Sequence, residues 1–357
     1  MKRVLSLLIR PETVTNVSRL KAMGKKSDSL AVIMSGSPDP DAMASAMALY
    51  EIIRQTSGLR KCVFASTDTF IREQNFEFAR AMKIEIKRLA ETTIGDYSLV
   101  ALVDAQPSFF RDGLTDSIQP QIVLDHHPRT GTWHAELEDI RESYGSLSTV
   151  MTEYLLAAKV KIPRILYTAL LYGIKSDTNN LERDVLLEDI GAYYFNFSRA
   201  NRQLIRRIEM NQIPERYLKY YEHAYRHRRR YRERMTCFLG RVESADVCVQ
   251  VADFYLRIIN IYYVVIAGIF KDRLIIVFRG DGYRQDCGAI AKKAFGKFGS
   301  AGGHKSAARV EIPLTALKEI VPEDFSQEAT DHFLVQQLRR EKPAPQPNAG
   351  NSKTVIR

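Results

Sequence analysis

The sequence predicts an α/β protein: a parallel sheet with helices on both faces, a connecting helix, and then a smaller mixed α+β domain. In the first third of the chain, continuous apolar runs alternate with helical patterns, as in a parallel sheet that is covered on both faces. Around residue 225 the chain becomes rich in arginine and tyrosine. Beyond residue 236, short β-branched runs follow one another with brief turns between them, which favours a mixed sheet.

The expected elements follow in chain order. Strands are predicted at residues 30–35, 61–65, 84–89, 99–103 and 121–124, and helices at 41–56, 72–82, 147–159, 163–175 and 185–209. A helix at 214–235 is polar enough to bridge two domains. Strands at 236–242, 247–252, 261–269, 273–278 and 307–312 then alternate with helices at 287–298 and 323–341.

Composition indicates an ordinary globular protein, with 45% hydrophobic and 26% charged residues. No apolar run approaches the roughly 20 residues that a transmembrane helix needs. The four cysteines are scattered without a CxxC pair, so neither a zinc site nor a disulfide framework is indicated. We therefore expect a cytoplasmic protein with no membrane contact. Its net charge of +10 favours polyanionic partners such as nucleotides or nucleic acid.

Carboxylates follow several of the predicted strands. Asp39 and Asp41 lie in a proline-rich turn after the first strand, and Asp104 and Asp125 directly follow two later strands. A turn-closing role for Asp39 and a helix-capping role for Asp41 would explain that pair locally. Because the carboxyl ends of parallel strands meet at one edge, convergence of all four at a ligand site is the stronger interpretation.

Histidines and a further acid extend this set. His126 and His127 follow Asp125, and Asp177 lies at the polar end of an apolar helix. So many carboxylates would repel one another unless cations joined them. Carboxylate and imidazole together suit manganese or a similar ion, and such a set fits a two-metal hydrolase.

These motifs, in this order, resemble those of the DHH phosphoesterases. The resemblance rests on the Pro-Asp-Pro-Asp-Ala turn, Val103-Asp104, Asp125-His126-His127 and the segment 173–178, and it covers roughly residues 28–315. It implies that two Mn²⁺ ions are held by Asp39, Asp41, Asp104, His126 and Asp177, with hydroxide attack on phosphorus in an inter-domain cleft. It also implies that His127 acts at the scissile phosphate and that Asp125 orients the imidazoles.

The second half is similar to the DHH-associated C-terminal domain. The resemblance implies substrate binding by Arg279, Gly302, Gly303 and His304, although a plain glycine turn would explain that segment alone. The expected domains are an N-terminal segment (1–28), a DHH catalytic domain (29–195), a helical linker (196–235), a substrate-binding domain (236–315), a C-terminal helix (316–341) and a disordered tail (342–357).

Ser35 departs from the family pattern, which begins its first motif with a metal-binding histidine. A serine hydroxyl is a poorer manganese ligand than imidazole. The first ion could then be weak, could recruit another ligand, or could be absent. Because the carboxylates for two-metal chemistry are present, we expect activity to be retained.

The arginine-rich stretch 226–234 has two interpretations. Interleaved tyrosine and arginine could contact nucleic acid by stacking and phosphate binding. Alternatively, it is a solvated linker helix whose tyrosines pack on neighbouring residues.

The predicted function is a metal-dependent phosphodiesterase, resembling an oligoribonuclease, that hydrolyses short oligonucleotides exonucleolytically or acts on related small nucleotide phosphoesters. Cyclic dinucleotides and nucleoside bisphosphates are alternative substrates. A protein that binds nucleotides or nucleic acid without hydrolysis is the alternative of another class, and Ser35 favours it. The sequence leaves the oligomeric state open, including a homodimer.

Overall fold

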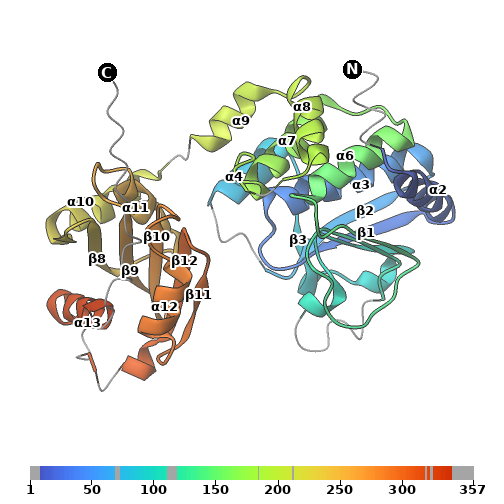
Figure 1. The fold of residues 1–357 in the computed structure, drawn as a ribbon. Coiled ribbons are helices and arrows are strands. Elements are labelled where there is room, and N and C mark those ends of the chain that lie inside the picture. Colours follow the sequence, from blue (N-terminus) through green and yellow to red (C-terminus); the bar gives the residue numbers. More distant parts are fainter. Residues whose placement is uncertain are drawn as a thin grey trace, which may run out of the picture. The chain divides into compact units, whose positions relative to one another are not determined.

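The computed structural model describes residues 9–68, 73–110, 119–183, 185–210, 213–317, 320–321 and 325–339. The chain forms two compact units, residues 1–211 and 212–357, each built on its own sheet (Figure 1). The predicted tail at 342–357 and the first eight residues lie outside the described residues. None of the described helices has the length and apolar character needed to cross a membrane.

The first unit contains a six-stranded, fully parallel sheet in the order β3-β2-β1-β4-β5-β6. Its strands are β1 (Ser29–Met34), β2 (Lys61–Ser66), β3 (Lys87–Arg88), β4 (Leu99–Val103), β5 (Ile122–Asp125) and β6 (Leu137–Ile140). The order of strands reverses between β1 and β4, and ligands of open α/β sheets bind outside the carboxyl ends of strands at such a point. The predicted parallel α/β sheet is confirmed, whereas the α-helices predicted on both of its faces are found, among the described residues, on one face only.

Helices position the strand ends by packing on one face of this sheet (Figure 1). They are α2 (Pro11–Lys25), α3 (Pro40–Thr56), α4 (Glu73–Met82), α6 (Leu147–Ala158), α7 (Arg164–Asp177), α8 (Leu187–Phe197) and α9 (Arg202–Glu209). Alternate strand residues such as Leu30, Val32 and Met34 face this helical layer. Ala31 and Ile33 point to the opposite face, where the described residues contribute only short 3₁₀ helices and loops.

The second unit contains a six-stranded mixed sheet in the order β11-β12-β10-β9-β8-β7. Its strands are β7 (Arg229–Tyr231), β8 (Arg234–Arg241), β9 (Tyr263–Phe270), β10 (Arg273–Gly280), β11 (Ser300–Gly303) and β12 (Ala307–Pro313). Helices α10 (Leu218–His227) and α11 (Asp246–Leu256) cover one face. Helices α12 (Cys287–Phe295) and α13 (Gln327–Arg339) cover the other. The predicted smaller mixed α+β domain is confirmed.

Several predicted elements differ from the structure. The predicted strand at 247–252 is part of helix α11, because Val247, Cys248, Val251, Ala252 and Tyr255 form one buried helical face. The predicted helix at 214–235 ends at His227, and the edge strand β7 follows it. The predicted helix at 185–209 is broken at 198–201 into α8 and α9. The predicted strand at 84–89 is reduced to β3, and the predicted helix at 323–341 begins at Gln327. Helix α2 and strand β6 were not predicted.

Candidate metal centre

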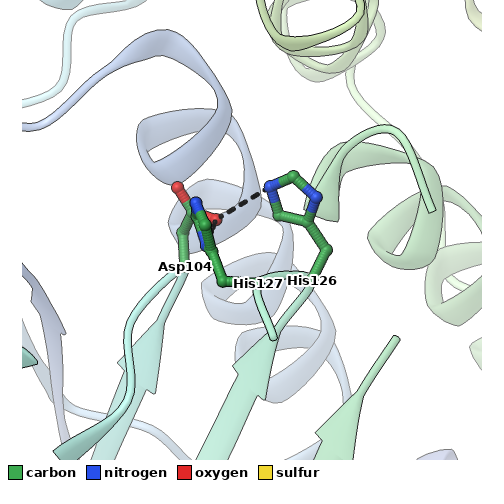
Figure 2. A group of neighbouring side chains, drawn as sticks. All are labelled: Asp104, His126 and His127. Carbon is green, nitrogen blue, oxygen red and sulfur yellow. Dashed lines mark ion pairs between the residues drawn. The ribbon is translucent and has the colours of Figure 1, made fainter. Parts of the chain in front are cut away.

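Three carboxylates surround the His126 imidazole at the carboxyl edge of the first sheet. His126 Nε2 lies 3.3 Å from Asp177 Oδ2, 3.5 Å from Asp104 Oδ1 and 3.8 Å from Asp41 Oδ2. Asp104 follows β4, His126 follows β5, Asp41 lies in the first turn of α3, and Asp177 is the last residue of α7. Figure 2 shows the His126 ring directed at Asp104, with His127 beside them.

Asp41 is held rigidly by the N-terminus of helix α6. Its carboxylate oxygens accept hydrogen bonds from the backbone N–H groups of Leu147 (2.7 Å) and Ser148 (2.8 Å). Unpaired N–H groups at a helix N-terminus favour an anion, so this contact fixes a fully buried carboxylate. The helix-capping role considered for Asp41 is wrong: Asp39 is the N-cap of α3, and its Oδ1 accepts from the N–H of Ala42.

Each imidazole is oriented by a hydrogen bond at Nδ1. His126 Nδ1 lies 3.1 Å from the carbonyl oxygen of Tyr144, which leaves Nε2 directed at the acids. His127 Nδ1 lies 2.9 Å from Asp125 Oδ1, and the same oxygen accepts from the backbone N–H groups of both histidines. Partners of this kind fix which ring nitrogen is available to a metal or a substrate.

Electrostatics at this edge are dominated by burial of like charges. Burial and the neighbouring Asp177 carboxylate raise the pKa of Asp39 to about 6 and that of Asp41 to about 7. Burial, together with Asp39 and Asp41, raises the pKa of Asp104 well above its usual value. The surrounding acids outweigh burial at His126 and raise its pKa to about 10. Without a bound cation, these raised pKa values mean that ionising all the carboxyl groups of the cluster is unfavourable.

The residues present fit a divalent cation. Asp104 Oδ1 and His126 Nε2 are both buried without a hydrogen-bond partner, although buried polar atoms are normally paired. Ligand atoms within 4.8 Å of one another form two groups, Asp41/His126/Asp177 and Asp104/His126/His127. Oxygen and imidazole nitrogen donors in this combination suit manganese and similar ions. Asp104 also has a φ of 55°, a left-handed conformation that is costly outside glycine and is often found at functional sites.

Asp39 and Ser35 occupy the start of the predicted first metal site. Asp39 lies close enough to affect the pKa of Asp104, but its oxygens belong to neither group of potential ligands. Ser35 is partly buried just after β1. His134 offers no replacement, since its side chain is 91% exposed and pairs with Glu138.

Of the predicted substrate residues, Gly302, Gly303 and His304 lie at the end of β11 beside helix α12, whereas the Arg279 side chain pairs with α11 on the other face of the sheet. Gly303 has a φ of 149°, and a Cβ there would lie 2.4 Å from the carbonyl oxygen of Ala307, so only glycine fits. The backbone N–H of the neighbouring His304 donates to that same carbonyl. Arg279 forms an ion pair with Asp253, and its Nε donates a hydrogen bond to Asp253 Oδ1 at 2.7 Å. Gly302 pairs with Arg309 across the β11–β12 ladder.

Some residues that shape the site were missed in the sequence. Asp189, on α8, is fully buried and accepts hydrogen bonds from the N–H groups of Gly145 and Leu186 and from the Thr149 hydroxyl. It thereby fixes residues 144–149, which hold both His126 and Asp41. Gly173 on α7 lets that helix approach the same place: a Cβ would lie 2.3 Å from Ser148 Oγ. No local motif marks Asp189, because its partners are distant in sequence. Gly173 begins the segment 173–178 on which the family resemblance rests, but nothing in that segment indicates its packing role.

Residues 29–174 match the N-terminal domain of the DHH family, and this range contains Asp41, Asp104, His126 and His127. The first unit therefore carries a domain that matches the DHH family. Its fold matches that of an exopolyphosphatase-related protein from Bacteroides fragilis, with a TM-score of 0.61 and 16% identity over 91% of this chain and 96% of that one. This likeness establishes the fold alone.

Two further similarities are more distant or incomplete. An uncharacterized protein from Methanocaldococcus jannaschii is 27% identical over 301 residues, which make up 84% of this chain and 61% of that protein. The chain therefore spans about three fifths of the length of that relative. A structure of exonuclease RecJ bound to manganese aligns over 94% of this chain and 97% of that one at 11% identity, with a TM-score of 0.46.

Proposed function

We propose that this protein is a metal-dependent phosphoesterase of the DHH family that hydrolyses short oligonucleotides or related small nucleotide phosphodiesters. The observation that carries this proposal is the convergence of Asp41, Asp104 and Asp177 on His126, whose Nε2 is buried without a hydrogen-bond partner. A structural role alone would leave buried like charges uncompensated, at a cost in stability.

The proposed ligands of a divalent ion are Asp41, Asp104, Asp177 and His126, and Mn²⁺ is the ion that this donor set favours. Asp39 would join a second ion with Asp104. When bound, such ions would neutralise charge on a phosphoryl group and activate water. The chain's own contribution is to fix Asp41 on the α6 N-terminus and His126 on the Tyr144 carbonyl before substrate arrives.

His127 is the proposed group for contact with the scissile phosphate. Its side chain is 45% exposed, and its Nδ1 donates to Asp125, so Nε2 is the ring atom available to substrate. A positioned imidazole could donate a hydrogen bond to a phosphate oxygen or handle a proton. Arg279, Gly302, Gly303 and His304 would bind the far end of the substrate, in a role that rests on the family resemblance.

Asp177→Asn tests this function. The substitution keeps the shape of the side chain and removes one carboxylate beside His126, so a hydrolase should lose manganese affinity and turnover together. Purified protein would be assayed for bound manganese by elemental analysis. Hydrolysis would be followed by chromatography on dinucleotides, longer RNA, cyclic dinucleotides and nucleoside bisphosphates. Wild-type protein that binds less than one manganese ion and turns over none of these substrates would contradict the proposal.

A binding protein without hydrolysis is the second candidate, and the position of Ser35 favours it. Asp39 joins neither group of potential ligands among the described residues, and a serine hydroxyl at position 35 is a poorer manganese ligand than imidazole. In that case Asp177→Asn would leave nucleotide affinity intact or strengthen it, because a negative charge near the phosphate is removed.

A further inference from the structure

A groove of about 720 Å³ lies on the second unit, on the face of the sheet that α10 and α11 cover. Its lining includes four aromatic side chains and two arginines: Tyr221, Tyr225, Phe254, Tyr255, Arg228 and Arg230. We call this surface the Tyr/Arg groove. It is formed within one unit, by the end of α10, the edge strand β7 and the end of α11.

Two of the rings in this groove are open to solvent. Tyr225 is 65% exposed and Phe254 is 51% exposed, whereas Tyr217 and Tyr220 of the preceding turns are buried in the core. Tyr221 packs edge-on against Phe254, with the ring centroids 5.4 Å apart, and so fixes its orientation. Exposed aromatic faces that are held in place are suited to stacking on flat ligands.

The two arginines of the groove carry uncompensated charge. Arg226 pairs with Glu222 and Arg229 pairs with Asp331, but Arg228 and Arg230 have no carboxylate partner among the described residues. Both side chains donate to backbone carbonyls, Arg228 to that of Tyr225 and Arg230 to that of Arg232, and the Arg228 guanidinium also lies 4.2 Å from the centre of the Tyr225 ring. Strand alternation explains the difference, since neighbouring residues of β7 point to opposite faces of the sheet.

The groove is distinct from the predicted substrate residues of the same unit. Strand β7 forms one edge of the six-stranded sheet, and β11, which carries Gly302 and Gly303, forms the opposite edge. In Figure 1, α10 lies beside β8, and β11 lies at the other edge of this sheet. A ligand in the groove would therefore use contacts that the proposed active site does not supply.

We propose that the Tyr/Arg groove binds a segment of single-stranded nucleic acid, with bases stacked on Tyr225 and Phe254 and phosphates at Arg228 and Arg230. Every nucleotide presents a flat base and an anionic phosphate, which matches the alternation of rings and guanidinium groups in the lining. A peptide would need aromatic and acidic side chains at the same spacing, so a nucleic-acid strand is the simpler complement.

Binding of a fluorescent single-stranded hexaribonucleotide, measured by anisotropy with the full chain in EDTA, tests the proposal. The double variant Arg228→Gln/Arg230→Gln should flatten the dependence of log affinity on log salt by about 1.4, since each lost contact to a single-strand phosphate removes about 0.7. Phe254→Leu should weaken binding by about 5- to 150-fold, the range measured for losing one stacked base. Circular dichroism would verify that both variants remain folded.

The matched control is Arg216→Gln/Arg226→Gln, which removes the same charge from the same unit but outside the groove lining. This control should leave the salt dependence near that of the wild type. Equal effects of both double variants would overturn the proposal in favour of general charge attraction. Displacement of the RNA by AMP at equal concentration would also overturn it, because a mononucleotide site would then suffice.

EDTA removes hydrolysis from the measurement, so the groove and the proposed function can fail separately. Lost RNA binding in the groove variants would support the groove even if the wild type hydrolysed nothing. Wild-type protein that hydrolyses dinucleotides but does not bind the hexaribonucleotide in EDTA would overturn the groove alone.

Discussion

At the scale of single residues, Asp104 combines three unfavourable features in one side chain. It is buried among other acids, its Oδ1 has no hydrogen-bond partner, and its backbone has a left-handed φ. Each of these features lowers the stability of the folded protein, and their coincidence in one residue is typical of a ligand-binding site. Replacing Asp104 should therefore raise the stability of the metal-free protein and lower its affinity for metal.

Asp104→Asn should stabilise the metal-free protein and abolish tight manganese binding. The amide removes a buried like charge and tolerates the left-handed conformation, so we expect a gain of about 1 kcal/mol in the free energy of unfolding in EDTA. Urea denaturation would measure it, with Asp96→Asn at an exposed position as the control. A metal-free variant that is less stable than the wild type would contradict this explanation.

The stability of the metal-free protein should fall as pH rises. The pKa values of Asp39 and Asp41 are raised from 3.8 to about 6 and 7, so their contribution is full below pH 3.8 and lost as pH rises through 6 to 7. His126 acts in the same direction, from its usual 6.5 to about 10. Urea denaturation in EDTA at pH 5 and pH 8 would show the loss, and added manganese should reduce it because the ion replaces the protons. Equal losses with and without manganese would count against a metal at this cluster.

At the scale of elements, the site depends on how closely α3, α6 and α7 approach one another. The N-terminus of α6 binds Asp41, and Gly173 of α7 lies against both Asp41 and Ser148. The carboxyl end of α7 then supplies Asp177. Helix packing therefore sets the distances between acids that come from separate strands and helices.

Gly173→Ala should weaken metal binding through packing alone. Its Cβ would lie 2.3 Å from Ser148 Oγ and 3.1 Å from the Asp41 Cα, so α7 must move outward. We expect a loss of about 1–3 kcal/mol in stability, as for overpacked cores, and a lower manganese affinity. Gly58→Ala is the control, because a Cβ there meets nothing within 4 Å. Unchanged stability and manganese affinity would contradict this prediction and would mean that small shifts of the neighbouring side chains accommodate the Cβ.

Asp189→Asn should affect the site through residues 144–149. An amide has one acceptor oxygen where the carboxylate uses two for Gly145, Leu186 and Thr149, so this segment loses its anchor. We expect manganese affinity to fall about 10- to 100-fold, the usual effect of disturbing groups that orient metal ligands. Isothermal titration would measure it, with Glu188→Gln as a neighbouring control. Restored affinity in Asp189→Glu would support a positioning role.

At the scale of the whole molecule, the two units should respond differently to metal. All the proposed ligands belong to the first unit, and a ligand stabilises the part of a protein that binds it. Manganese at 100 times its dissociation constant should add about 2.7 kcal/mol to the first unit alone. Hydrogen exchange with and without manganese would show protection confined to residues 9–210. Equal protection of the second unit would mean that the units unfold together.

The sequence by itself determined the parallel sheet and the place of its acids. Apolar strands ending in Asp104 and Asp125 must meet at one edge, because parallel strands share their carboxyl ends. Tertiary structure decided what spacing could not: Asp189 and Gly173 act through partners far along the chain, and the alternating valines of 247–251 form a helix because a sheet covers that face. The sequence predicts one helix through the arginine-rich stretch, whereas residues 229–231 form the edge strand β7 and pair with β8. Because side chains alternate along a strand, this pairing directs Arg230 into the Tyr/Arg groove and Arg229 toward Asp331. Composition does not determine these directions.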